Sequence, residues 1–211
     1  MTFYRTILVS GLTAAGKTTH SKLLAEDLGW SYVDMASVRK EILGEQLVFS
    51  ERDREWTPSH DQLRAADINI DLEADQRMAA IVADRSNIVV DAWLQPWLYQ
   101  AGDALRIWIE SSVETRIMKT AVATMRRGEV PSSRIADVLA AKDEFSRAHF
   151  QRLYSIDLYG DPAIFTMMLN NSRFIDEPSI DKSDAGIAAF RPVLRRQVQL
   201  VLQRTGRPDG N

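Results

Sequence analysis

The chain has 211 residues, of which 26 are basic and 29 are acidic, so its net charge is −3. This length suits one domain over residues 1–211. The charge balance excludes a global attraction to nucleic acid or to an anionic membrane, so an anionic ligand needs a local cluster of donors. The chain contains no cysteine, which excludes disulfides, zinc sites built on thiolates and cysteine nucleophiles.

The cellular compartment follows from what the sequence lacks. Residues 1–5 run straight into an apolar segment, without the basic region and long apolar core of a signal peptide. No stretch approaches the ~20 apolar residues of a membrane helix. With the missing cysteines, these features predict a cytoplasmic protein that binds neither membrane nor nucleic acid. The oligomeric state stays open.

Apolar runs and helical periodicities alternate along the chain. Short apolar runs predict strands at residues 6–10, 31–34, 87–91, 105–109 and 163–169. Apolar residues at helical spacing predict helices at residues 17–28, 36–83, 114–128, 133–153 and 184–203. We expect Gly29 to end the first helix, a break near Thr57 and Pro58, and Pro192 in or near the first turns of the last helix. This order predicts a three-layer α/β fold with a five-stranded parallel sheet.

Residues 11–18 (GLTAAGKT) lie between the first strand and the first helix and match the phosphate-binding P-loop motif. Glycines let the backbone curl so that several N–H groups point at phosphate oxygens, and the helix N-terminus adds positive charge. Lys17 reaches the β- and γ-phosphates of ATP, and the Thr18 hydroxyl holds Mg²⁺. The predicted nucleotide-binding residues of this segment are Gly11, Thr13, Ala14, Ala15, Gly16, Lys17, Thr18 and Thr19.

Asp91 ends the third predicted strand after three apolar residues. The carboxyl ends of parallel strands form the ligand crevice of such a sheet. Asp91 is therefore a candidate catalytic residue that holds Mg²⁺ together with Thr18. Two alternatives are contact with a substrate group and capping of the following helix.

From these segments the chain resembles the cytidylate kinase-like family of nucleoside monophosphate kinases. The resemblance covers roughly residues 7–171. It rests on GLTAAGKTTHSKLLAEDLGW, on NIVVDAWLQPW, on LRIWIESSVETRI and on KDEFSRAHFQRLYSIDLYGDP, which follow in the family's order and spacing. The resemblance implies a core sheet with a helical substrate-binding insert at about residues 36–83 and a mobile lid at about residues 116–134.

The resemblance also assigns roles to single residues. Lid residues Arg126 and Arg127 would neutralise charge during transfer, unless they are a solvated helix end. Arg116 would stack on the adenine ring of ATP. Arg39 would hold an acceptor phosphate, unless it is a surface residue. Trp93 stands where the family has an arginine, and Lys142 and His149 replace two more in the later helix. Trp56, Trp93 and Trp97 are candidates for a ring-binding pocket or for the core.

Three functions follow. The first is a kinase that transfers phosphate from ATP to a pyrimidine nucleoside monophosphate, whose anionic oxygen needs no base. The second is a kinase for a hydroxyl of a nucleoside, a sugar or an antibiotic-like molecule. Asp34 would then be the base, unless it only caps the next helix. The third is a nucleotide-binding protein without catalysis. The fewer arginines favour the second function, and the overall resemblance favours the first.

Overall fold

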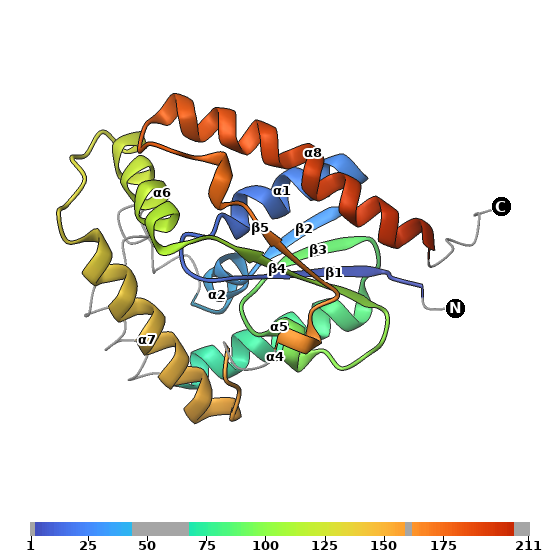
Figure 1. Cartoon of the computed structure of the whole chain (residues 1–211). Coiled ribbons are helices and arrows are strands. Elements are labelled where there is room, and N and C mark those ends of the chain that lie inside the picture. Colours follow the sequence, from blue (N-terminus) through green and yellow to red (C-terminus); the bar gives the residue numbers. More distant parts are fainter. Residues whose placement is uncertain (1–2, 44–67, 159–161, 205–211) are drawn as a thin grey trace.

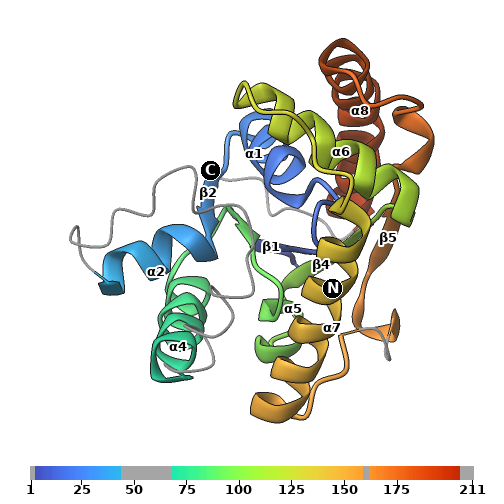
Figure 2. The same ribbon diagram turned by 90° about the vertical axis from the view of Figure 1, so that its left-hand side faces the viewer.

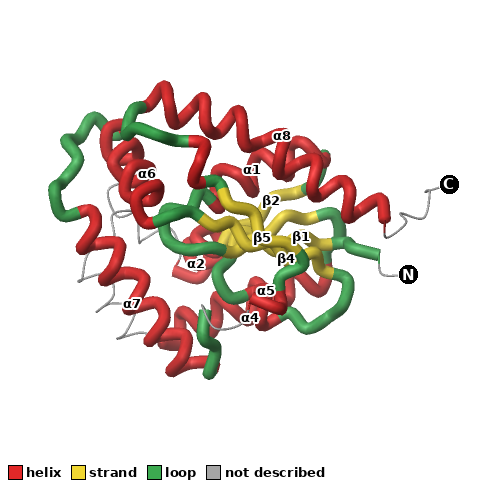
Figure 3. Tube along the Cα trace, viewed as in Figure 1, coloured by secondary structure: helices red, strands yellow, loops and turns green. Residues whose placement is uncertain are grey.

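The computed structural model describes residues 3–43, 68–158 and 162–204. Its centre is a sheet of five parallel strands in the order β2-β3-β1-β4-β5. The strands are β1 (Thr6–Ser10), β2 (Ser31–Asp34), β3 (Ile88–Asp91), β4 (Ala104–Glu110) and β5 (Met167–Asn170). Helices cover both faces of the sheet, as Figure 1 and Figure 3 show. The predicted α/β fold with a five-stranded parallel sheet is therefore confirmed.

The two faces of the sheet bury separate apolar cores. Ile7 and Val9 of β1 point to one face, where they pack under α1 (Lys17–Leu28) and α8 (Ile180–Arg204). Leu8 points to the other face, toward α2 (Met35–Leu43) and α4 (Ile68–Asp84). This alternation is the two-residue period of a strand. The remaining elements are α5 (Gln95–Leu98), α6 (Val113–Arg126), α7 (Ile135–Tyr154), η2 (Pro162–Ile164) and η3 (Ser172–Phe174).

The carboxyl ends of the strands meet at one edge of the sheet, and Figure 2 looks onto this edge. There the P-loop joins β1 to α1, while α2 and α4 stand on one side and α7 on the other. The start of β1 and the end of α8 lie at the opposite end of the molecule (Figure 1). In parallel α/β sheets ligands bind at the carboxyl edge, so we expect the ligand-binding site at this edge.

Three predicted elements differ from the observed ones by more than one or two residues at an end. The fifth strand was expected at residues 163–169 but begins at Met167, because Pro162 starts a 3-10 turn and Phe165 packs on Trp97 and Trp108. Trp97 is thus part of an aromatic cluster. The predicted helical run 36–83 contains α2 and α4, and its expected break at Thr57 and Pro58 lies outside the described residues, as does Trp56.

The last helix begins earlier than predicted. The Ser179 hydroxyl accepts the Lys182 N–H, and α8 starts at Ile180. Pro192 was expected in or near the first turns, and this was wrong, because it lies in the middle of the helix. A proline there lacks the N–H that would donate to the carbonyl four residues earlier in the helix. The predicted end of the first helix is confirmed, since Gly29 is left-handed and donates to Ala25 and Glu26.

Within the described residues, no helix combines the length and the apolar character required to span a bilayer.

Candidate functional site

The P-loop is shaped by close approach to β4. A Cβ added to Gly11 would lie 2.3 Å from the carbonyl oxygen of Ile109, so no larger residue fits there. Ala14 and Gly16 have φ angles of 60° and 94°, which turn the chain back into α1. A left-handed alanine is costly for an L-residue. Such a conformation is typical of a backbone that is fixed by what it has to bind.

Lys17 curls back over the loop. Its ammonium donates to the carbonyls of Gly11 and Leu12, at 2.9 and 3.0 Å, and lies 5.1 Å from the centre of the Trp93 ring. Only 9% of the residue is exposed, and burial lowers the pKa of Lys17 to about 8. Trp93 thus lies beside the lysine of the P-loop motif, whose ammonium is turned toward the loop carbonyls in this structure.

Thr18 and Asp91 meet at the mouth of the loop. The Thr18 hydroxyl donates to Asp91 Oδ2 at 2.5 Å, and the Tyr32 hydroxyl lies 3.4 Å from the same oxygen. Burial raises the pKa of Asp91, and Lys17 and the Thr18 hydrogen bond partly offset this rise. A hydroxyl and a carboxylate oxygen are hard ligands that fit Mg²⁺, which keeps most of its other positions for water and substrate phosphates. Within the described residues, no cluster of three or more His, Asp and Glu side chains forms a metal cage.

Asp34 is a second acid at the end of a strand. The two residues are paired in register at the ends of β2 and β3. Asp34 Oδ1 accepts the Ser37 N–H at 2.8 Å, and Oδ2 accepts the Ser37 hydroxyl at 3.1 Å. Asp34 therefore caps α2, and it is half-buried at the carboxyl end of β2.

An ion-pair cluster joins the three helices α2, α4 and α7. Asp71 of α4 accepts from Arg39 of α2 at 2.7 Å and from His149 of α7 at 2.9 Å. Arg152 lies 3.5 Å from His149 Nδ1 and can only donate, so we assign the ring proton to Nε2. His149 is 1% exposed and has both ring nitrogens in contact with protein groups. The structure thus unites Arg39 and His149, two predicted substrate residues, around an acid that the sequence did not single out.

Arg116 lies between the P-loop and α7. It is 4% exposed, and its guanidinium pairs with Asp143 at 2.5 Å and contacts the Thr13 carbonyl at 3.3 Å. The sequence predicted that Arg116 stacks on adenine. In this structure its guanidinium is directed at Asp143 and the loop backbone.

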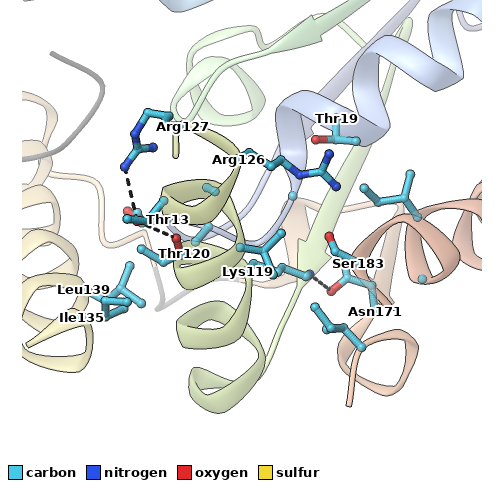
Figure 4. A pocket seen from close by; sticks show the side chains of 18 of the residues that line it. Thr13, Thr19, Lys119, Thr120, Arg126, Arg127, Ile135, Leu139, Asn171 and Ser183 are labelled. Carbon is cyan, nitrogen blue, oxygen red and sulfur yellow. Dashed lines mark hydrogen bonds between the residues drawn. The ribbon is translucent and has the colours of Figure 1, made fainter. Parts of the chain in front are cut away.

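A pocket of about 570 Å³ runs between α6 and the P-loop, from α7 at one end to η3 and α8 at the other. Arg126, Arg127 and Lys142 line it, and Figure 4 shows the two arginines extending from the end of α6 in different directions. Arg126 pairs with Asp184 of α8, while Arg127 lies 3.3 Å from Glu129 and from the Thr124 hydroxyl. Both are at the pocket wall.

Sequence reasoning missed Lys119 and Asn171, which form the floor of this pocket with Ser111 beneath them. Ser111 and Asn171 directly follow β4 and β5, so polar residues after each strand were the available signal. Lys119 lies on α6 three residues after Arg116, where it reads as one more charge on a solvated helix face.

Known proteins are similar to this chain in sequence and in fold. A family described as "Cytidylate kinase-like family" matches residues 6–173. The cytidylate kinase of Aeropyrum pernix is 32% identical over 168 residues, which are 79% of this chain and 90% of that protein. The cytidylate kinase of Haloquadratum walsbyi is 27% identical over 188 residues, 88% and 91% of the two chains.

Solved structures share the fold at low identity. A putative kinase from Chloroflexus aurantiacus has a TM-score of 0.52 and 16% identity, and the match covers 94% of this chain and 98% of that one. A shikimate kinase from Bacteroides thetaiotaomicron has a TM-score of 0.50 and 14% identity, with 90% and 98% covered. At such identity these structures support the fold alone.

Proposed function

The chain belongs to the cytidylate kinase-like family, and from this premise we propose that it transfers the γ-phosphoryl group of ATP to a small-molecule acceptor. The contact of Thr18 with Asp91 beside Lys17 carries this proposal. It places a cation and two hard oxygen ligands where a P-loop would present the terminal phosphates of ATP with Mg²⁺. Lys17 and Asp91 are buried, and the Thr18 hydroxyl next to them is exposed to an incoming ligand.

The donor side of the reaction follows from these groups. The backbone N–H groups of residues 13–19 bind phosphate oxygens, and Lys17 leaves the carbonyls of Gly11 and Leu12 to bind the β- and γ-phosphates. Mg²⁺, held through Thr18 and Asp91, supplies charge neutralisation at the phosphates. Arg126 and Arg127, in the predicted lid of residues 116–134, stand at the wall of the pocket and would turn inward toward a bound triphosphate.

The acceptor site lies across the crevice, between α2 and α4 on one side and α7 on the other. Our first candidate acceptor is a pyrimidine nucleoside monophosphate, and the relatives named cytidylate kinase support it. Arg39 would bind the acceptor phosphate, with Lys142 nearby on the side of the donor. An anionic phosphate oxygen attacks directly, so positioning supplies most of the catalysis.

A second candidate is a neutral hydroxyl compound, and the cluster around Asp71 favours it. Asp71 already neutralises Arg39, and His149 is held by Asp71 and Arg152 rather than aimed into the crevice. A dianion gains little from a cation that is paired with a carboxylate. Asp34, adjacent to Asp91 in register, would then accept the proton of the attacking hydroxyl.

The acceptor is found by incubating the protein with ATP, Mg²⁺ and single compounds and measuring ADP release. The panel contains the ribo- and deoxynucleoside monophosphates, the nucleosides, and small sugars and alcohols. If no compound of the panel raises ADP release above the rate seen without acceptor, the protein is better described as a nucleotide-binding protein without catalysis.

Two variants then separate the candidates. Asp34→Asn keeps the cap of α2, because asparagine caps as well as aspartate, so a loss of turnover reports on chemistry. A hydroxyl acceptor predicts a loss in kcat of about 10²–10⁴ in this variant and a small effect of Arg39→Ala. A monophosphate predicts the reverse order, with the KM for the acceptor raised in Arg39→Ala. Ser37→Ala is the control for the cap.

A further inference from the structure

Three side chains close a ring of hydrogen bonds under the P-loop, and we call them the carbonyl clamp: Lys119, Ser111 and Asn171. The Lys119 ammonium donates to the Ala15 carbonyl at 3.1 Å, to Ser111 Oγ at 2.7 Å and to Asn171 Oδ1 at 2.6 Å. The Asn171 amide donates to the same Ala15 carbonyl at 2.9 Å. Ser111 donates to Asn171. Figure 4 shows Lys119 extending from α6 to Asn171.

The ammonium of Lys119 is saturated by the protein. A lysine has three N–H donors and no acceptor, and the three donors meet Ala15, Ser111 and Asn171. It therefore has no spare donor for a phosphate of ATP, although it lines the nucleotide pocket. A lysine that binds ligand directly would leave at least one donor facing the pocket. The partners of Lys119 point to a role that acts on the loop.

The Ala15 carbonyl is the point on which the clamp acts. Ala15 is fully buried in the P-loop, between the left-handed residues Ala14 and Gly16. A loop that turns its N–H groups toward phosphate has to turn carbonyls away from it, and each buried carbonyl needs a donor. Lys119 and Asn171 supply two donors to this one oxygen, which uses both of its lone pairs.

The clamp holds a cation in an unfavourable place. Burial lowers the pKa of Lys119 to about 8, and its hydrogen-bond partners within the described residues are neutral oxygens rather than a carboxylate. Lys119 is half-buried, and a charge that is partly withdrawn from water without an opposite charge beside it destabilises a fold. Natural sequences tolerate such departures chiefly at functional sites.

We propose that Lys119 is a positioning residue for ATP binding: together with Asn171 it holds the Ala15 carbonyl outward and so fixes the P-loop in its phosphate-binding form. The inference rests on the proposed function only in taking ATP as the ligand of the loop. Because the clamp joins the loop to the ends of β4 and β5, it also links the pocket floor to the phosphate end of the site.

The test is ATP binding by calorimetry, with Mg²⁺ and a non-hydrolysable ATP analogue, which needs no knowledge of the acceptor. Lys119→Met removes the charge and takes one hydrogen-bond partner from each of Ala15, Ser111 and Asn171. We expect the Kd for the analogue to rise about ten-fold, which is within the range for residues that affect binding without touching the ligand. The melting temperature should equal or exceed that of the wild type, because a half-buried charge is gone. Lys182→Met, an exposed lysine of α8, is the matched control and should bind as the wild type does.

Lys119→Arg, which keeps the charge and the donors, should bind the analogue more tightly than Lys119→Met. With the acceptor in hand, the KM for ATP should rise in Lys119→Met while the KM for the acceptor stays unchanged. Equal Kd values for wild type and Lys119→Met would overturn the clamp. A wild type that does not bind the analogue would instead overturn the proposed function. If Lys119→Met does not fold, Lys119→Gln, which cannot reach all three acceptors, is measured against the same criteria.

Discussion

Replacing Asp71 with asparagine tests whether the buried cluster braces the acceptor side. Asp71 is 3% exposed and gives one carboxylate oxygen to Arg39 and the other to His149. Asparagine has nearly the same shape but no charge, and it has one acceptor oxygen in place of two. The variant therefore weakens two charge-assisted contacts at once, and these contacts tie α4 to α2 and to α7.

The size of the effect follows from these contacts. A hydrogen bond to a charged group contributes about 1.5–3 kcal/mol, and the retained oxygen keeps one of the two bonds as a neutral contact. We expect Asp71→Asn to lower the free energy of unfolding by about 3 kcal/mol. For a domain of this size, 1 kcal/mol moves the melting temperature by about 2–4 °C. The expected decrease is therefore about 6–12 °C.

Thermal unfolding followed by circular dichroism measures this decrease. Asp137→Asn is the control, because Asp137 forms an exposed pair with Arg134 at 3.8 Å, and such a pair is worth less than about 1 kcal/mol. The KM for the acceptor should rise in Asp71→Asn, while the affinity for ATP stays the same. Similar melting temperatures for the two variants would show that the cluster does not brace the three helices.

Three further predictions concern the donor side. Lys17→Ala should lower phosphoryl transfer by about 10²–10³ without changing the melting temperature, because one preorganised charge at the phosphates is lost; wild-type ADP release in this variant would refute the P-loop assignment. A chelator should abolish activity and Mg²⁺ or Mn²⁺ should restore it, since Thr18 and Asp91 offer hard oxygens; activity that survives the chelator argues against this metal site. Since the pKa of Lys17 is lowered to about 8, its ammonium loses its proton as the pH rises through that value, and kcat/KM for ATP should fall there. A profile that stays flat from neutral to alkaline pH would contradict this.

The fold could be predicted because its signals are local. Each central strand is an apolar run, and the P-loop fixes where β1 ends and α1 begins. An apolar run does not always mark a strand. Within residues 163–169, Phe165 packs in an aromatic cluster, and the strand begins only at Met167. The expectation that Pro192 lies near the start of its helix was also wrong, because a long helix packed on the sheet tolerates one missing hydrogen bond.

The residues of the candidate site could likewise be predicted only where the signal in the sequence is local. Lys17, Thr18 and Asp91 were found because strand ends and a loop motif are visible in the sequence, and the structure brings them together. Asp71 and Lys119 were missed because their burial depends on helices distant in the chain. His149 lies 78 residues from Asp71, and Asn171 lies 52 residues from Lys119. On an isolated helix, Asp71 and Lys119 would each be one more surface charge.

The distribution of buried charge gives an argument for function that is independent of family. Arg116 pairs with Asp143, and Asp71 pairs with Arg39, so these buried charges are offset by opposite ones. Around the P-loop the balance differs. Burial shifts the pKa of Lys17 and of Lys119 downward and that of Asp91 upward, in each case against the charged form. A fold selected for stability alone would replace such groups with apolar ones. Lys17 and Asp91 lie at the mouth of the P-loop and offset each other only in part, which agrees with the proposal that a polyphosphate and a metal ion bind there.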